Sequence, residues 1–179
     1  SVDGDDSNGG TESAPFATIG HALSFVKDVG SPTTIYVNAG IYSPDQTGEV
    51  FPIIVPNNVH LIGDDAETTI LDATADIENQ AAVVIIKEVE TVTLKNFTLT
   101  NGNSEGHGCT GGGGLLLTAD DMFNLETEVA ADIPSSTPVI ENVIIENNHS
   151  HNGGGMAFFR VNGPILSNVV IRNNTATAF

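Results

Sequence analysis

The stretch PVIENVIIENN, residues 138–148, decides the fold because it returns 26 positions later as PILSNVVIRNN, residues 164–174. Both copies open on a proline, carry an internal asparagine and close on an asparagine pair. A third copy, VTLKNFTLTNG at residues 92–102, aligns with the first at an offset of 46. The alignment predicts two columns of equivalent asparagines, one of Asn96, Asn142 and Asn168 and the other of Asn101, Asn147 and Asn173.

Glycine runs follow the asparagine turns, and GGGGLLL (111–117) corresponds to GGGMAFF (153–159). Each unit therefore reads as three short strands separated by Asn or Gly turns, because apolar residues alternate over a few positions between turn residues. Weaker copies precede them in VHLIG (59–63), TTILDA (68–73) and AVVIIK (82–87). The signature of leucine-rich repeats does not recur, so that alternative is not favoured.

A repeating unit of three strands predicts an all-β fold, a single-stranded parallel β-helix of about three to four coils. In such a fold each strand stacks on the corresponding strand of the previous coil. Inward Val, Ile and Leu form the core, and stacked Asn side chains hydrogen-bond from coil to coil as a structural ladder. We expect one domain over residues 1–179, with coils in 33–179 and an inserted loop at 118–137.

One helix is expected in PFATIGHALSFVKDVG, residues 15–30, where the apolar residues follow helical spacing. Thr18 is the expected N-cap and Gly30 the expected stop. Within the N-terminal segment 1–32, this helix would cap the open end of the stack. The C-terminal NNTATAF (173–179) lacks such a cap, which predicts a fragment of a longer solenoid or an end covered by a partner subunit.

The charge balance limits the partners of the chain, since 5 basic and 23 acidic residues give a net charge of −18. Such a surface is unsuited to nucleic acid or to anionic membranes, because binding them requires Lys and Arg. It suits divalent cations or cationic partners. No run approaches the ~18 apolar residues of a membrane-spanning helix, and the single Cys109 excludes an intrachain disulfide.

Several segments in the first part of the chain resemble the opening of bacterial extracellular β-helix proteins. They are DGDDSNGGTESAPFATIGHAL (3–23), TIYVNAGIYS (34–43), VPNNVHLIGDD (55–65) and TTILDA (68–73). The resembling family has no known function and precedes pectate-lyase-like solenoids. Residues 92–179 resemble, more broadly, the glycine and asparagine turns of bacterial surface β-helix proteins. The resemblance implies a right-handed coil and a secreted or cell-surface location, with polysaccharide binding, cleavage or adhesion in different relatives.

The N-terminal sequence DGDDSNGG is a candidate calcium site. Asp3, Asp5, Asp6 and Asn8 supply closely spaced oxygen ligands on a Gly-rich turn, and oxygen is the ligand that Ca2+ takes. The final Glu of an EF-hand loop is missing. The alternative is a solvated turn in which these side chains bond to the local backbone.

A second candidate metal site, for zinc or copper, combines His107, Cys109, His149 and His151. Both segments follow the second Asn turn in consecutive coils, so stacking would bring them about one strand spacing apart. Imidazoles and a thiolate are suitable ligands for these metals. The loop 101–111 is longer than its counterpart, and the alternative is a set of exposed turn histidines.

The inserted loop is a candidate binding loop because long loops on solenoids often carry function. Its acidic residues are Asp120, Asp121, Glu126, Glu128 and Asp132. The alternative is a tolerated, solvated excursion. Neither a basic proton abstractor for a lyase nor a facing carboxylate pair for a glycosidase stands out, so no catalytic residue is assigned.

These observations favour a secreted or cell-surface domain that is non-catalytic in this segment and serves adhesion, glycan contact or subunit assembly. The expected partners are a polysaccharide, a cell-surface glycan or further copies of the chain, and Ca2+ is the expected cofactor, beside the zinc or copper hypothesis for the histidine site. Two alternatives stay open. The chain is the N-terminal part of a polysaccharide lyase or glycoside hydrolase, or it is the protomer of an extracellular filament that stacks through its open coil end.

Overall fold

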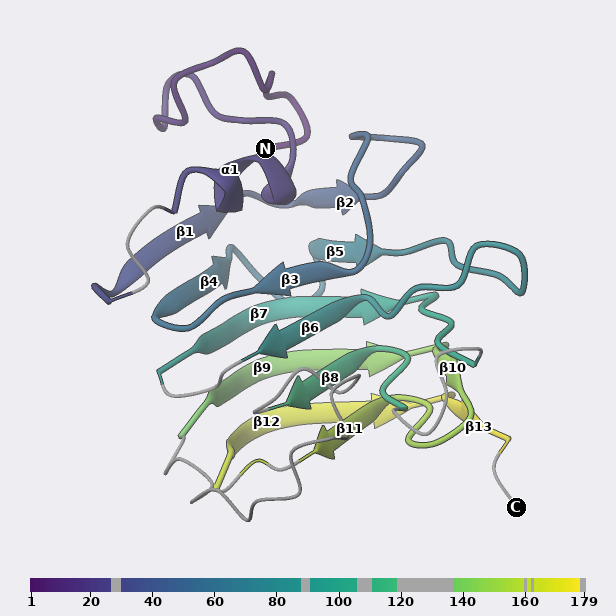
Figure 1. The fold of residues 1–179 in the computed structure, drawn as a ribbon. Helices are drawn as coiled ribbons and strands as arrows, with labels where there is room; N and C mark the ends of the chain where they lie inside the picture. The colour runs from purple at the N-terminus through teal and green to yellow at the C-terminus, as the bar shows by residue number, and fades with distance from the viewer. Residues whose placement is uncertain are drawn as a thin grey trace, which may run out of the picture.

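The structure is a computed structural model, and it describes residues 1–26, 30–87, 91–105, 111–118, 137–159, 161 and 163–177. The described chain is all-β, with parallel strand pairs throughout and one short helix (Figure 1). Its arrangement is compatible with the expected parallel β-helix. No helix in the described ranges is long and apolar enough to cross a membrane.

One sheet has seven strands and runs the whole length of the stack. Its members are β1 (Thr33–Val37), β2 (Gly40–Tyr42), β4 (Val59–Gly63), β5 (Thr69–Asp72), β7 (Thr93–Thr100), β9 (Val139–Glu146) and β12 (Ile165–Arg172). The early strands β4 and β5 pair with the two halves of β7, so that two short strands of one coil lie beside one long strand of the next.

A four-stranded sheet lies across the core from the first (Figure 1). It contains β3 (Ile53–Val55), β6 (Val84–Lys87), β8 (Leu115–Thr118) and β11 (Met156–Phe159). A small third sheet joins β10 (His149–Ser150) to β13 (Thr175–Ala176). Fully buried aliphatic and aromatic side chains fill the space between the sheets, among them Leu94, Phe97 and Leu99 of β7 and Leu115 and Leu117 of β8.

The registers between coils reproduce the offsets of the sequence repeat. Thr93 pairs with Val139, an offset of 46, and Val139 pairs with Ile165, an offset of 26. One detail differs from the expected three separate strands. The two segments that flank the first Asn of each repeat form one continuous eight-residue strand, because a single residue with positive φ bends the strand without ending it.

The helix α1 spans Ile19–Ser24 and begins as expected, with the Thr18 hydroxyl accepting from the backbone N–H of His21 at 3.1 Å. The expectation that it runs to Gly30 is wrong. Phe25 and Val26 donate to carbonyls three residues back, which tightens the last turn and ends the helix. The Phe25 ring stacks on Phe16, with a centroid distance of 5.0 Å.

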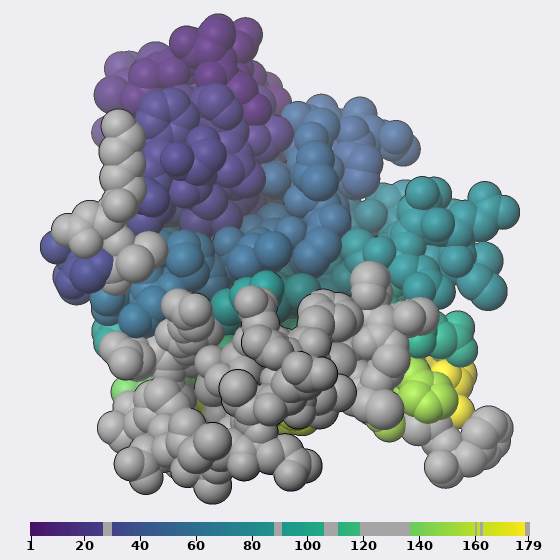
Figure 2. All heavy atoms as spheres, in the orientation of Figure 1, coloured from purple at the N-terminus to yellow at the C-terminus, as the bar shows by residue number. Residues whose placement is uncertain are grey.

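Figure 2 shows the N-terminal segment gathered as one mass at the end of the stack. The helix lies there with the loop that precedes it, next to β1 and β3 (Figure 1). Ile19 is buried and joins the core, whereas Phe25 is half exposed. The cap is therefore built mainly from irregular chain, with a short helix as its base.

Candidate functional site

The N-terminal acidic side chains bond to the chain around them. Both side-chain oxygens of Asp6 accept hydrogen bonds, from the backbone N–H groups of Ala17 and Thr18 at 2.8 and 3.0 Å and from the Thr18 hydroxyl at 2.8 Å. Burial raises the pKa of Asp6, but these bonds outweigh it and hold the pKa below its ordinary value. Asp6 therefore ties the N-terminal loop to the start of α1.

The other three members of the candidate calcium site are spread along the same loop. Asp5 accepts from the backbone N–H and the hydroxyl of Ser7, and these bonds lower its pKa. The Asn8 amide donates to the Pro15 carbonyl at 2.9 Å, and Asp3 is exposed. Across the described residues, no group of three or more His, Cys, Asp or Glu is placed to hold a metal ion. Calcium binding stays a prediction.

Glu49 binds the N-terminus of α1, a contact that the sequence did not reveal. Glu49 is 1% exposed, and its carboxylate accepts from the backbone N–H groups of Ile19 at 2.6 Å and Gly20 at 2.9 Å. Burial raises the pKa of Glu49 more than these bonds lower it. The contact joins residues 30 positions apart, so no local pattern could have indicated it.

The first asparagine column forms a side-chain ladder. Asn142 donates to the amide oxygen of Asn96 at 3.1 Å, and Asn168 donates to that of Asn142 at 2.8 Å. Asn96 itself donates to the Gly63 carbonyl at 2.9 Å. All three asparagines have a positive φ, which Asn tolerates better than most residues. The same residues thus bend each long strand and connect it to its neighbours.

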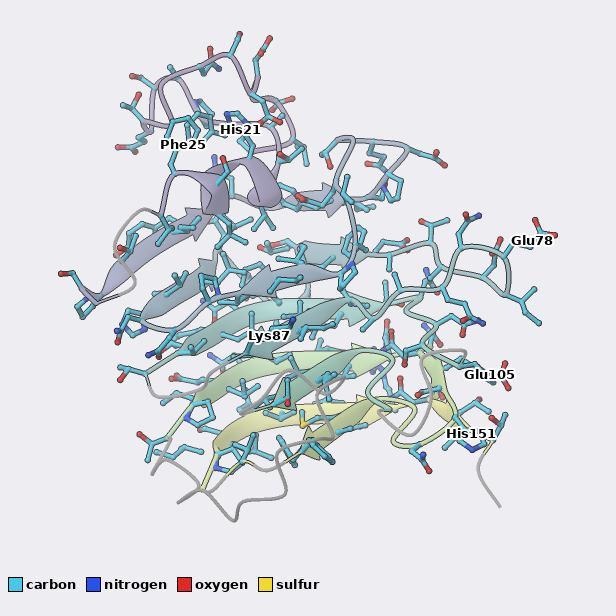
Figure 3. The ribbon with its side chains drawn as sticks, viewed as in Figure 1. His21, Phe25, Glu78, Lys87, Glu105 and His151 are labelled. Atoms are coloured by element: carbon cyan, nitrogen blue, oxygen red, sulfur yellow. The ribbon has the colours of Figure 1, made fainter. Side chains whose placement is uncertain are left out.

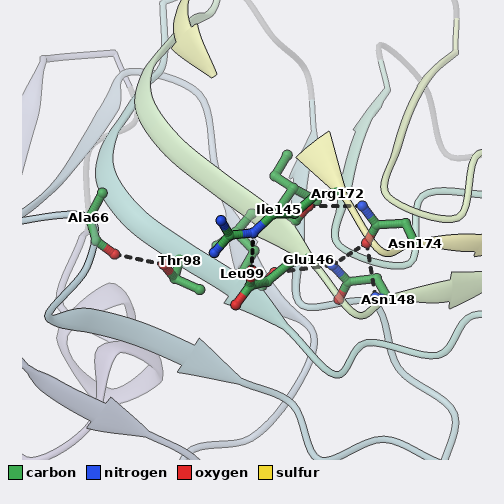
Figure 4. Close-up of polar contacts among 8 residues, drawn as sticks. All are labelled: Ala66, Thr98, Leu99, Ile145, Glu146, Asn148, Arg172 and Asn174. Carbon is green, nitrogen blue, oxygen red and sulfur yellow. Dashed lines mark hydrogen bonds and ion pairs between the residues drawn. The ribbon is translucent and has the colours of Figure 1, made fainter. Parts of the chain in front are cut away.

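At the second turn two adjacent asparagines divide these tasks. Asn101, Asn147 and Asn173 are exposed and have the positive φ. Asn101 donates to Asp72 of the preceding coil at 2.9 Å. In the two later coils the bonds come from the next residues, where Asn148 donates to the Asn174 amide oxygen at 3.0 Å and Asn174 donates to the Ile145 carbonyl at 2.8 Å (Figure 4). The repeated Asn-Asn pair therefore combines a turn residue with an inward hydrogen-bonding residue.

Two of the three histidines of the candidate zinc or copper site, His149 and His151, lie beside this turn. His149 pairs with Thr175 and forms a parallel bridge with Asn103. Its Nε2 lies 3.2 Å from a carboxylate oxygen of Glu105, whose other oxygen accepts from Thr177. His151 is exposed at the same edge as Glu105 (Figure 3). Three consecutive coils are thus linked through one carboxylate.

Two other groups of predicted site residues lie outside the described residues. They are His107 and Cys109 of the metal site, and Asp120, Asp121, Glu126, Glu128 and Asp132 of the binding loop. Their predicted roles stay predictions. The register places Asn103 opposite His149, so the residues directly stacked on the histidine segment come from 103–105.

The cap and the first coil enclose a cleft of roughly 490 Å³ that the sequence did not indicate. It is lined by Tyr36 of β1, by Phe16 of the N-terminal loop, and by Glu12, Asn38 and Asp64. Tyr36 is 76% exposed, so its ring presents an open aromatic surface. Asp64 is partly engaged, since it accepts from the Ala39 N–H at 2.8 Å. The cleft combines an aromatic platform with polar side chains, which is the usual make-up of a small-ligand site.

A second hollow lies on the other side of the turn that contains Asp64. It is lined by the asparagine ladder, by Ile144 and Val170, and by Asp65, Ala66 and Glu67 of the turn. The turn is held in place by the Thr98 hydroxyl, which donates to the Ala66 carbonyl at 2.7 Å (Figure 4). One turn therefore borders both the cleft and this groove.

Comparison with models of protein families gives a match over nearly the whole chain. The model of the family DUF1565, described as a protein of unknown function, matches residues 2–178. The expected resemblance to a family of unknown function covered the first 73 residues, and the match extends through the asparagine repeats as well. No curated protein and no solved structure matches the chain.

Proposed function

The chain belongs to the DUF1565 family, and from that premise we propose that it is a glycan-binding domain of a secreted or cell-surface β-helix protein. The proposal places the sugar in the cleft beneath the N-terminal cap, with Tyr36 as its platform. The segment is non-catalytic in this proposal. The single observation that supports it most is the highly exposed aromatic ring inside a polar cleft.

The proposed coil is a right-handed, pectate-lyase-like solenoid. Parallel strands joined by a crossover connection are right-handed in nearly all known cases, because the twist of the strands favours that hand. Every crossover between β1, β4, β7, β9 and β12 joins parallel strands of one sheet. The resemblance noted in the sequence favours the same hand.

The chemistry of the lining suits a sugar. A pyranose ring has an apolar C–H face, which packs on an aromatic ring, and a rim of hydroxyl groups that donate and accept hydrogen bonds. Tyr36 supplies the ring, and Asn38 and Glu12 supply polar groups around it. Apart from the α-amino group of Ser1, no cation lines the cleft among the described residues. An acidic polysaccharide would therefore be disfavoured, and a neutral glycan fits better.

A glycan array followed by calorimetry on the best neutral glycan tests the proposal. We expect Tyr36→Ala to weaken binding about tenfold, which corresponds to about 1.4 kcal/mol, and Tyr36→Phe to change it little because the ring is kept. Val50→Ala is the matched control, since Val50 is 77% exposed and does not line the cleft.

Equal affinities for the wild type and Tyr36→Ala would refute the role of the cleft. The non-catalytic assignment has a separate test. Ultraviolet absorbance from unsaturated uronic products, appearing when the chain is mixed with acidic polysaccharides, would show that the segment is a lyase.

A further inference from the structure

The groove along the asparagine ladder has a chemistry of its own. It occupies roughly 490 Å³, and its floor and walls come from three strands and one turn: Asn96, Asn142, Ile144, Asn168, Val170 and residues 65–67. Residues 65–67 form one wall. The ladder crosses the strands, so the groove follows the direction in which the coils stack.

The ladder leaves hydrogen-bond acceptors facing the groove. Asn142 and Asn168 each use an amide N–H to reach the preceding asparagine, whose oxygen accepts that bond. An amide oxygen has two lone pairs, so Asn96 and Asn142 each keep one for a ligand. The wall adds carboxylate oxygens, which only accept when ionised. Asn142 and Asn168 also each keep a second amide N–H, but the acceptors outnumber these donors, so the groove favours a ligand that donates hydrogen bonds.

The floor is apolar and repeats from coil to coil. Ile144 pairs with Val170, and both occupy outward positions of the long sheet, with Val170 42% exposed. Neighbouring strands lie about 4.8 Å apart. Apolar contacts and acceptors thus recur at about this spacing, which is close to the length of one sugar unit in an extended β-1,4-linked chain.

The acidic residues on the wall of the groove determine which hydrogen-bond donors can bind there. Asp65 and Glu67 are exposed on the wall, and the described residues that line the groove include no cation. A polyanion such as a uronic acid polymer or a nucleic acid would meet uncompensated repulsion. An uncharged chain with many hydroxyl groups and apolar ring faces would meet no such electrostatic repulsion.

We propose that the ladder groove binds a neutral, linear polysaccharide whose chain runs across the strands, along the stacking direction. The ring faces pack on Ile144 and Val170, and the hydroxyl groups donate to the asparagine and carboxylate oxygens. The groove is separate from the cleft proposed above and lies on the other side of the turn at Asp64. Binding in the groove therefore does not depend on Tyr36.

Calorimetry with neutral β-1,4-linked oligosaccharides, from disaccharide to hexasaccharide, tests the proposal. The two series are cello-oligosaccharides and N-acetylchito-oligosaccharides. In at least one of them we expect the affinity of the wild type to rise about tenfold from the disaccharide to the hexasaccharide. Val170→Lys is expected to remove this rise, because it places a charged chain on the floor. Ile165→Lys is the matched control on the same strand, since Ile165 is 51% exposed and lies outside the groove.

The outcomes separate the two sites. Loss of the length dependence in Val170→Lys with disaccharide binding intact supports the groove. An affinity that does not rise with length in either series, or that rises equally in Val170→Lys and Ile165→Lys, overturns it. Tyr36→Ala is expected to weaken the disaccharide and leave the gain with length in place. Oligogalacturonate that binds with Ca2+ and is released by EDTA, while neutral chains do not bind, also overturns the proposal.

Discussion

Replacing Asn148 by Ala is expected to destabilise the protein severely. Asn148 is 1% exposed, and its side chain makes three hydrogen bonds, of which Figure 4 shows those to Leu99 and Asn174. Its oxygen accepts from the Gly102 N–H at 2.8 Å, and its amide donates to the Leu99 carbonyl and to the Asn174 side chain, both at 3.0 Å. Alanine cannot replace any of these bonds.

The cost follows from what the substitution leaves behind. The Gly102 N–H and the Leu99 carbonyl belong to buried residues and would lose the Asn148 side chain as a partner. A buried polar group without a partner costs about 1–3 kcal/mol. Two such groups, with the lost bond to Asn174, lead to an expected loss of roughly 3–5 kcal/mol in the free energy of unfolding. That is a large fraction of the 5–15 kcal/mol that is usual for a domain.

The neighbouring Asn147 is the matched control. It is exposed and has a φ of 57°, so its contribution is conformational. Asn147→Ala is expected to cost about 1 kcal/mol because alanine disfavours the left-handed region. Asn147→Gly is expected to be close to neutral, since glycine adopts positive φ readily.

Urea unfolding followed by far-ultraviolet circular dichroism measures these differences, because the chain has no Trp for fluorescence. A shift in the midpoint at unchanged slope reports stability. The reasoning would be refuted if Asn147→Ala cost as much as Asn148→Ala, or if Asn148→Ala lost less than about 1 kcal/mol.

Three further predictions concern the cap, the glycine turns and calcium. Burial raises the pKa of Glu49, which favours its protonated form in the folded state. We therefore compare the free energy of unfolding of the wild type with that of Glu49→Gln at several pH values. The wild type should lose stability relative to the variant as the pH rises from below the ordinary glutamate pKa to above the raised pKa of Glu49. Gly114→Ala should destabilise strongly in the same urea assay, because its Cβ would lie 2.6 Å from Ile145 Cγ2, whereas Gly9→Ala meets no atom within 4 Å and should be neutral. Calorimetry with Ca2+ should give a smaller heat for Asp5→Ala than for the wild type, and equal heats would end the calcium hypothesis.

The stacking of the coils could be predicted from the sequence because the offset between repeats gives the register between neighbouring strands. An offset that aligns the asparagines also aligns the inward Val, Ile and Leu, and a shift by one residue would turn every inward side chain outward. The observed pairings of β9 with β7 and β12 follow these offsets. A periodic sequence therefore specifies which strands are neighbours, even though the paired residues are far apart along the chain.

Other features were not accessible to sequence reasoning because they depend on distant contacts. The helix α1 ends where Phe25 packs on Phe16, a contact that helical periodicity does not record. The carboxylate of Glu49 reaches the start of the helix from another turn. The asparagine pair at residues 147–148 indicated a turn, but the spacing alone did not show which residue points inward.

The turn between β4 and β5 shows how a binding surface can arise from a fold that does not require it. Seven residues (63–69) lie between Ile62 and Ile70, where two (96 and 97) lie between their partners Lys95 and Thr98. The later coils make this bend with a single asparagine, so the five extra residues are not needed for stacking. They project outward, border the cleft through Asp64 and form a wall of the ladder groove. We therefore expect that shortening this turn to one asparagine would extend the ladder, keep the fold and weaken both proposed glycan contacts.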